Sequence, residues 1–436
     1  MFELRFNSWY EIIIMKSQVT NEPSCADPFE ADSIRVKLAI ERIESSIDIL
    51  REIEVLTLRD CLGRINAATV TSPINVPGHR NSAMDGYALS SNDLSRGESR
   101  FEIIGKAFAG KPFDQSCVRN QCVRIMTGAL MPPGTDTVIM QEQANLLEDN
   151  LVQVGSNHKT GENTREAGED VQQGEQILAP GDKIGAADLG VLASLGIASL
   201  VVKRKPTVAF FSTGDELVPI SKPLEKGQIH DSNRYTLYGM LANLEVDIID
   251  LGVIRDDPHK IRQALLDAAS KADLIITTGG VSVGEADYIK PILAEIGQTE
   301  FWKIAIKPGR PLTFGKIGES IFIGLPGNPV AVMVTFHLFV IPAIRKLAGA
   351  KAATVPILKA RSLETLGKKP GRMEIQRGIA EYNDKQEWQV GKTGKQGSGI
   401  LTSMSRANCF IILNEENEGV QAGEWVDIQF FEHAGI

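Results

Sequence analysis

Carboxylates follow three short apolar segments in the middle of the chain. Glu216 follows the first segment, Asp256 and Asp257 follow the second, and Glu285 and Asp287 follow the third. Acidic residues commonly cap helices or sit in turns, so one such residue alone indicates little. Ligands of open α/β sheets bind at the carboxyl ends of parallel strands, where all three loops would converge. Converging carboxylates suit Mg2+, commonly beside phosphate oxygens, and therefore predict a cation site.

Glycines add the ability to bind an anion through the backbone. Gly279 and Gly280 lie in the third loop, where backbone N–H groups can approach a phosphate closely. Pro326 and Gly327 lie in another loop that opens an apolar helix, whose free N–H groups can hold an oxyanion. The Pro326-Gly327 loop carries no charge of its own, so only its position at the start of a helix indicates an anion site. Together with the carboxylates, the glycines predict a phosphorylated ligand and a hard cation.

Two lysines precede a Pro-Gly pair. Lys303 and Lys307 can reach one anion whether their segment is extended or turned, and Pro308-Gly309 makes its end rigid. From spacing alone, solvated surface lysines are an equally good explanation.

The elements that must position these loops have the pattern of a parallel α/β sheet. From Pro206 onward, short apolar runs alternate with segments of helical period. We expect strands at 207–211, 246–253, 274–277, 302–306 and 320–323. We expect helices from Ser232 or Asn233, as the cap, to about 243, and at 258–272, 286–296 and 329–347.

The remaining chain predicts further domains. Residues 353–436 consist of glycine-punctuated short strands, which favours a small C-terminal β-barrel or sandwich. Residues 73–159 are typical of an inserted β-rich domain, and 33–72 plus 160–204 would form a helical, elongated linking domain. A long amphipathic helix is expected over 33–53, after a polar mobile arm at 1–32.

Charge and cysteine content narrow the function classes. The chain has 436 residues, with 46 Lys plus Arg against 55 Asp plus Glu and a net charge of -9. This balance argues against general binding to nucleic acid or anionic membrane, so any anion site must be local. The five cysteines are scattered without a C-x-x-C pair, which argues against a zinc site and fits a reduced cytoplasmic compartment.

Two apolar segments have the length or position of membrane or leader segments. Residues 321–344 carry no formal charge, but an internal Pro-Gly-Asn-Pro predicts a strand, a turn and a buried helix instead of a membrane span. Residues 1–15 contain an isoleucine run, but Glu3 and Glu11 interrupt the segment and no A-x-A site follows. We therefore expect no signal peptide, while an alternative start at Met15 stays open.

Several common catalytic motifs are absent or incomplete. Residues 105–112 nearly match the P-loop spacing, but Pro112 stands where the Mg2+-binding hydroxyl belongs, in a β-like context. We reject an NTPase loop there. No G-x-G-x-x-G or H-E-x-x-H sequence occurs.

A family signature is visible at residues 81–88, Asn-Ser-Ala-Met-Asp-Gly-Tyr-Ala. It resembles that of the molybdopterin molybdenumtransferase family, whose members insert molybdenum in the last step of molybdenum-cofactor synthesis and include the E domain of gephyrin. Further matches follow in order at 124–129, 165–170, 212–217, 278–288, 307–311, 324–329, 376–378, 396–398 and 408–411. The resemblance covers about residues 33 to 430.

The resemblance implies a fold and a reaction. The α/β domain would be a Rossmann-like molybdenum-cofactor-binding domain within a four-domain subunit of an elongated homodimer. Molybdate would enter the dithiolene of adenylylated molybdopterin, the adenylyl phosphoanhydride would be hydrolysed, and AMP would leave. A separate molybdopterin adenylyltransferase would supply the substrate, and molybdoenzyme maturation proteins would be further partners.

The resemblance also implies residue roles. Catalytic roles would belong to Asp287, Glu216, Asp85, Lys303 and Lys307. Mg2+ and the pyrophosphate would be held by Glu216, Asp256 and Asp287. Substrate-binding roles would belong to Thr127, Ser282, Gly279, Gly280, Asp256, Arg377, Ser398, Pro326 and Gly327. Asp85 and Thr127 would reach the site from the partner subunit, whereas Lys303, Lys307, Arg377 and Ser398 would hold molybdate.

Two other functions remain as alternatives. One is a non-catalytic scaffold of the gephyrin E-domain type, and the other is the preceding molybdopterin adenylyltransferase. The intact set of charged motif residues favours the insertase over the scaffold. The adenylyltransferase would need only the α/β domain and would leave the others unexplained. Molybdate and tungstate have nearly the same size and charge, so the sequence does not distinguish them.

Overall fold

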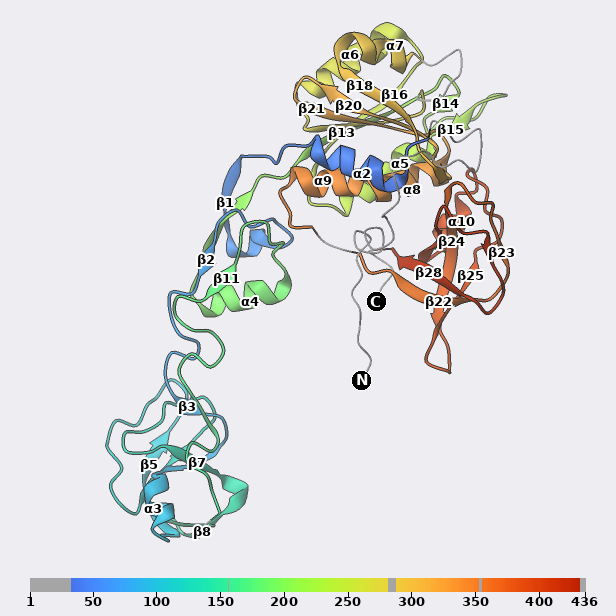
Figure 1. Ribbon diagram of the computed structural model, residues 1–436. Helices are drawn as coiled ribbons and strands as arrows, with labels where there is room; N and C mark the ends of the chain where they lie inside the picture. The colour runs from blue at the N-terminus through green and yellow to red at the C-terminus, as the bar shows by residue number, and fades with distance from the viewer. Residues whose placement is uncertain (1–32, 156, 281–287, 353–354, 432–436) are drawn as a thin grey trace. The chain divides into compact units, whose positions relative to one another are not determined.

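The computed structural model describes residues 33–155, 157–280, 288–352 and 355–431. Two compact units make up the chain. The first unit comprises Met1–Glu54, Gly63–Ile65 and Lys203–Ile436, and the second comprises Val55–Leu62 and Asn66–Val202. Figure 1 labels their helices and strands.

A six-stranded sheet is the centre of the first unit. Its order is β16 (Asp247–Ile254), β13 (Thr207–Thr213), β17 (Leu274–Thr278), β21 (Ser320–Leu325), β20 (Pro311–Ile317) and β18 (Gln298–Lys303). The first four strands are parallel, as predicted. The last two pair antiparallel, so the prediction of an all-parallel sheet was wrong at this edge.

Strand β20 escaped prediction because Pro, Gly and Lys interrupt its apolar pattern. It forms a tight hairpin with β21, in which Ile317 pairs with Ser320 and Gly318 has φ +60°. A hairpin needs no crossover helix, which is why the helix–strand alternation fails here. The strand expected at 302–306 ends at Lys303, and Ile306–Lys307 forms a separate short strand, β19.

Alternating side chains of the buried strands supply two apolar layers. Val208 and Phe210 of β13 face one core, and Ala209 and Phe211 face the other. The second core is covered by α6 (Pro258–Ala269) and α7 (Ile289–Ile296). The first is covered by α5 (Ser232–Ala242), α8 (Pro329–Thr335), the π-helical turn η3 (Phe336–Val340), α9 (Ile341–Leu347) and α2 (Val36–Ser45).

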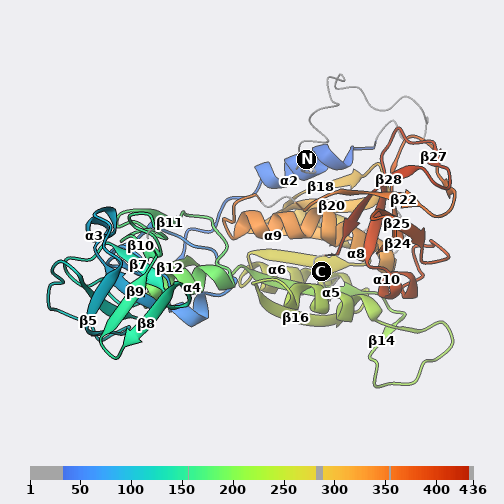
Figure 2. The same cartoon turned by 90° about the horizontal axis from the view of Figure 1, so that it is seen from below.

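Helix α2 lies alongside α9 in both views (Figures 1 and 2), with Val36, Ala39 and Ile43 buried. It ends at Ser45, so the helix expected over 33–53 is too long. Downstream, the N–H of Leu50 donates to the carbonyl of Leu347. The apolar residues after Ser45 therefore make tertiary contacts, although their spacing along the sequence resembles that of a helix. The helix therefore packs with the α/β core, although the sequence placed it in a linking domain.

Helix starts agree closely with the capping signals. Asp257 caps α6, accepting from the N–H groups of His259 and Lys260, with Pro258 in the first turn. For α5 the cap is Asp231, which accepts from the N–H of Arg234 at 3.1 Å. The prediction of Ser232 or Asn233 as cap was therefore one or two residues late, which leaves Asn233 free for another contact.

A closed five-stranded barrel follows, as predicted from the sequence. It consists of β24 (Met373–Tyr382), β25 (Trp388–Lys392), β22 (Leu358–Ser362), β28 (Trp425–Phe430) and β26 (Cys409–Leu413), closed by β24–β26 pairing. Strand β19 adds to β24 in parallel. The shorter elements of this unit are β14 (Leu217–Val218), β15 (Ile229–His230), β23 (Leu366–Gly367), β27 (Gly419–Val420) and α10 (Thr402–Arg406).

The second unit contains the predicted β-rich segment. Its sheet order is β7 (Thr137–Met140), β4 (Gly86–Leu89), β6 (Gln121–Ile125), β5 (Arg100–Ala107), β9 (Leu151–Val154) and β8 (Ala144–Glu148). A separate small core forms around α4 (Ala186–Ser194). The other elements are β1 (Ile53–Thr57), η1 (Leu58–Cys61), β2 (Val70–Thr71), β3 (Asn81–Ser82), α3 (Ser91–Ser95), η2 (Gln141–Gln143), β10 (Thr164–Arg165), β11 (Gln176–Leu178) and β12 (Ser199–Lys203). The four-domain boundaries stay a prediction.

One helical run in the described chain, Pro329–Leu347, is long and apolar enough to cross a membrane. Of its apolar window, 67% is buried inside the protein. Strand β21, a turn and this helix follow in the order expected from the sequence. Its burial against the sheet supports a core helix over a membrane span.

Candidate functional site

A cavity of about 720 Å3 lies between the α/β sheet and the barrel within the first unit. Loops of the α/β part form one side, and the barrel residues Glu374, Ile375, Arg377 and 396–398 form the other. The α/β side consists of Glu216, Ile229, Gly279, Gly280, residues 307–311, residues 326–329 and Ala331. Most of the predicted anion-binding loops therefore meet in one place.

The backbone of the glycine loop after β17 has positive φ angles at two consecutive residues. Gly279 and Gly280 have φ +84° and +64°, a region that L side chains rarely adopt. A Cβ on Gly279 would lie 2.6 Å from the carbonyl oxygen of Thr213. Only glycine fits this close approach, which keeps the loop backbone at the cavity wall.

Asn233 ties two of the cavity loops together. Its Nδ2 donates to the hydroxyl of Thr278 at 3.0 Å and to the carbonyl of Gly327 at 2.7 Å. The hydroxyl of Thr278 in turn donates to the carbonyl of Pro326 at 3.0 Å. Sequence reasoning missed this role because the three partners are distant in the chain, and it treated Asn233 as a candidate cap.

Arg377 is the least exposed charged residue of the cavity wall, at 1%. Its Nε donates to the hydroxyl of Ser403 at 3.0 Å and its Nη2 to the carbonyl of Gly397 at 3.1 Å. Burial lowers the pKa of this guanidinium from its ordinary value, an effect that the charge of Glu374 opposes. Among described residues, no carboxylate forms an ion pair with it. A buried cation without such a partner at a cavity wall indicates an anion site.

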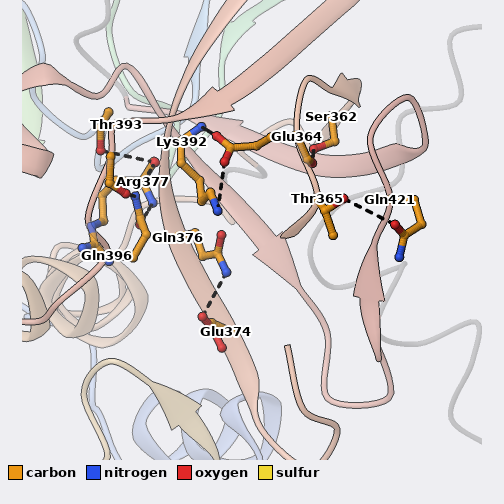
Figure 3. A network of polar contacts seen from close by, with 11 residues as sticks. Ser362, Glu364, Thr365, Glu374, Gln376, Arg377, Lys392, Thr393, Gln396 and Gln421 are labelled. Atoms are coloured by element: carbon orange, nitrogen blue, oxygen red, sulfur yellow. Dashed lines mark hydrogen bonds and ion pairs between the residues drawn. The ribbon is translucent and has the colours of Figure 1, made fainter. Parts of the chain in front are cut away.

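The backbone of Arg377 is held as firmly as its side chain. Gln396 accepts from the N–H of Arg377 at 2.8 Å and returns a hydrogen bond from its Nε2 to the carbonyl at 3.2 Å. Figure 3 shows these residues beside Thr393, whose N–H donates to the same carbonyl. The strand and the 396–398 loop are thereby fixed to each other, which places Ser398 at the cavity.

Lys307 pairs with Glu374 across the β19–β24 ladder. The Nζ of Lys307 lies 3.2 Å from Oε2 of Glu374, and the two are Cα partners in the parallel register. The turn beyond Lys307 requires glycine at position 309. Gly309 has φ +109°, and a Cβ added to it would lie 2.6 Å from Cγ2 of Thr335. Lys303 is exposed and is not one of the lining residues, so only one of the two expected lysines lies at the cavity.

The predicted carboxylate cluster is present in part. Glu216 lines the cavity, whereas Asp256 does not. Burial, and then the charges of Asp215 and Glu216, raise the pKa of Asp256, so these carboxyl groups are electrostatic neighbours. Asp287 and Ser282 lie outside the described residues. In the described part of the chain, no three acidic, His or Cys side chains form a metal-binding group.

Asp85 and Thr127 are joined directly in the second unit. Oδ1 of Asp85 accepts from the N–H of Thr127 at 2.7 Å and from its hydroxyl at 2.8 Å. These two bonds, the backbone one first, hold the pKa of Asp85 below its ordinary value. The hydroxyl of Thr127 is thus committed to Asp85, and Thr127 acts as a positioning residue for that carboxylate.

Comparison with known proteins decides the family. Three family models match: MoeA N-terminal region (domain I and II) at residues 34–196, a probable molybdopterin binding domain at 209–346, and MoeA C-terminal region (domain IV) at 359–431. A molybdopterin molybdenumtransferase of Haemophilus influenzae is 46% identical, over 87% of this chain and 94% of that protein. This chain belongs to the molybdopterin molybdenumtransferase family.

Other members of the molybdopterin molybdenumtransferase family and related proteins agree. Gephyrin of Dictyostelium discoideum is 33% identical, over 90% of this chain and 61% of gephyrin. The solved structure of a molybdopterin biosynthesis moeA protein from Pyrococcus horikoshii OT3 matches with a TM-score of 0.79 and 29% identity, over 92% of this chain and all of that one. The family resemblance drawn from the sequence is confirmed.

Within this family framework, the cavity-lining residues separate into predicted and missed ones. Predicted residues at the cavity are Glu216, Gly279, Gly280, Lys307, Pro326, Gly327, Arg377 and Ser398. Missed ones with polar side chains are Arg310, Asn328, Glu374 and Gln396. The first two and Gln396 stand inside matched motifs, which could have singled them out. Glu374 had no such signal, because its position opposite Lys307 depends on strand pairing.

Proposed function

We propose that the chain inserts molybdate into adenylylated molybdopterin, with hydrolysis of the adenylyl phosphoanhydride and release of AMP, in molybdenum-cofactor biosynthesis. Its relatives named molybdopterin molybdenumtransferase support the reaction class. The observation that carries the site is Arg377, a buried cation without a carboxylate partner in the described chain, at the wall of a cavity of about 720 Å3. An oxyanion would supply the missing charge.

Molybdate would be held by Lys307, Arg377 and Ser398. Two cations and a hydroxyl match a small dianion, because charge-assisted hydrogen bonds are stronger than neutral ones. Lys303 keeps its proposed role as a second lysine, although its exposed side chain lies outside the lining residues.

The phosphates would lie along the glycine loops. Backbone N–H groups of Gly279, Gly280 and Gly327 are available at the wall, where the contacts of Asn233 hold the two loops in register. Pro326 shapes the same loop, and Ser282 is proposed to complete the phosphate contacts. The negative charge of the phosphoanhydride must be neutralised while water or a molybdate oxygen attacks the phosphorus.

Magnesium is proposed as the cation of this reaction. The chemistry of the donor set fits it, because the negative charges of Asp215 and Glu216 bear on Asp256 and an added cation would relieve them. Glu216, Asp256 and Asp287 would hold Mg2+, which neutralises phosphate charge when bound. Asp287 is the proposed essential carboxylate.

Asp85 and Thr127 are proposed to reach the site from the partner subunit of a homodimer. Thr127 fixes one carboxylate oxygen of Asp85 through two hydrogen bonds, which aims the other oxygen. Adenylylated molybdopterin would come from a separate adenylyltransferase in the cytoplasm, and molybdoenzyme maturation proteins would receive the product. The thiols of Cys117, Cys122 and Cys409 are free in the described chain, which fits a reducing compartment.

The test is direct. The purified protein is incubated with adenylylated molybdopterin, Mg2+ and molybdate, and AMP and pterin-bound molybdenum are measured. AMP and pterin-bound molybdenum should appear together, and omission of molybdate should abolish the formation of pterin-bound molybdenum. Absence of both from the complete mixture would reject the insertase. The scaffold alternative predicts that result, whereas the intact cationic residues of the cavity favour retained chemistry.

A further inference from the structure

The cavity combines basic and acidic side chains in a way that anion binding alone does not explain. Lys307, Arg310 and Arg377 are the basic residues among the described lining residues, and Glu216 and Glu374 are the acidic ones. Glu216 belongs to the proposed cation site on the α/β side. Glu374 lies on barrel strand β24, three residues before Arg377, and has no role in the reaction as proposed. A carboxylate there opposes the binding of any anion.

Glu374 is the fixed partner in its ion pair. Its side chain is 12% exposed, whereas that of Lys307 is 56% exposed. The second carboxylate oxygen, Oε1, accepts from Nε2 of Gln376 at 3.0 Å, as Figure 3 shows. With one oxygen bound to Gln376 and the other facing Lys307, the carboxylate cannot turn away when an anion enters. The lysine has the freedom to move.

The same carboxylate acts on the buried guanidinium. The charge of Glu374 is felt at Arg377, although the two form no ion pair. Glu374 is thus shared electrostatically between the two cations proposed to hold molybdate. Its repulsion of a bound anion scales with the anion's charge, so a dianion is penalised about twice as much as a monoanion.

We propose that Glu374 is an affinity-limiting counterion, which neutralises Lys307 in the ligand-free protein and weakens the binding of inorganic dianions to the cavity. The inference rests on the proposed function in placing the oxyanion at Lys307 and Arg377. The buried Arg377 and the exposed Lys307, without a neighbouring acid, would retain sulfate or phosphate, which have the size and charge class of molybdate. Glu374 lowers the affinity for all of these anions, so that the dianion exchanges and the site stays open to molybdate.

The experiment separates charge from packing. Binding of molybdate, sulfate and the monoanion nitrate to the full chain is measured by titration calorimetry without pterin, for the natural protein, Glu374→Gln and Glu374→Asp. Glu374→Gln keeps an oxygen acceptor for Gln376 but removes the charge. We expect molybdate and sulfate to bind it about tenfold more tightly, and nitrate about threefold more tightly. Glu374→Asp keeps the charge and should remain within about threefold of the natural protein for sulfate.

Glu364→Gln is the matched control. Glu364 pairs with Lys392 at 3.0 Å in the same barrel, away from the cavity lining, and Figure 3 shows this pair too. Its loss should leave anion affinity unchanged. Unchanged or weaker dianion binding by Glu374→Gln overturns the counterion role and leaves the insertase proposal intact. If neither the natural protein nor the variant binds molybdate, the anion assignment of the cavity fails as well.

Discussion

The side chain of Asn233 holds the backbone of Gly327. Its Nδ2 lies 2.7 Å from the carbonyl oxygen of Gly327 and 3.0 Å from the hydroxyl of Thr278. One amide at the start of α5 therefore connects the loops after β17 and β21, which both line the cavity. These loops carry the backbone donors proposed for the phosphates, so their spacing should depend on Asn233.

Asn233→Asp should raise the KM for adenylylated molybdopterin about tenfold with a smaller change in kcat. The carboxylate has the shape of the amide but sets an acceptor against the carbonyl of Gly327, and two hydrogen bonds are lost. Steady-state kinetics of AMP release measure the effect. Asn243→Asp, an exposed change at the other end of α5, is the control. Equal KM values for both variants would contradict the role of Asn233.

Arg377→Met should abolish molybdate insertion while leaving the fold in place. The guanidinium is buried without a carboxylate partner in the described chain, so its removal orphans no buried acid. Lost hydrogen bonds to Ser403 and Gly397 should cost about 1–2 kcal/mol of unfolding free energy. Calorimetric binding of molybdate and a thermal unfolding scan give the two readouts.

The control for this variant is Arg361→Met, which removes an exposed arginine of barrel strand β22 that stacks on Trp425. It should keep molybdate binding. Retained molybdate binding in Arg377→Met would show that the anion is held elsewhere.

Thr127→Val should raise the pKa of Asp85 toward its ordinary value. The hydroxyl bond is lost, while the stronger effect of the Thr127 N–H remains, so the rise should be partial. Because the folded-state pKa lies below the unfolded value of 3.8, ionised Asp85 stabilises the fold above that pH. This stabilisation is lost as the pH falls through the folded pKa, and the variant should lose it at a higher pH.

Carboxyl NMR of aspartate-labelled protein measures that pKa. Thr135→Val is the control, since the hydroxyl of Thr135 donates to the carbonyl of Pro132 and forms no hydrogen bond with a carboxylate among the described residues. An unchanged Asp85 pKa in Thr127→Val would show that the hydrogen bond from the Thr127 hydroxyl does not lower the pKa of Asp85.

Asp287→Asn should preserve folding but reduce AMP release at least ~100-fold, as expected for loss of an essential charged group. A quenched assay with adenylylated molybdopterin, molybdate and saturating Mg2+ measures the product. Asp267→Asn on α6, where the carboxylate accepts from Gln263, controls for a general loss of negative charge. Normal turnover in Asp287→Asn would remove this residue from the catalytic set.

Several loops that line the cavity were predictable because each of them is a short segment of the sequence. Gly279-Gly280, Lys307-Pro308-Gly309 and Pro326-Gly327 each combine a turn with a donor or charge within a few residues, and all of them line one cavity. The parallel core strands and the barrel were also predictable, since apolar periods reveal burial. The family signature added the reaction, which no spacing alone identifies.

Tertiary structure alone decided which charges face one another. Glu374 lies opposite Lys307 through strand pairing between residues that are 67 positions apart, and Asn233 meets Gly327 across 94 positions. Lys303 and Lys307 looked equivalent in sequence, but the break between β18 and β19 leaves only Lys307 at the cavity. Sequence spacing reports neighbours along one element, whereas register and burial arise from packing between elements. The sequence by itself therefore determined the loops and their chemistry, and packing determined the charge balance of the cavity.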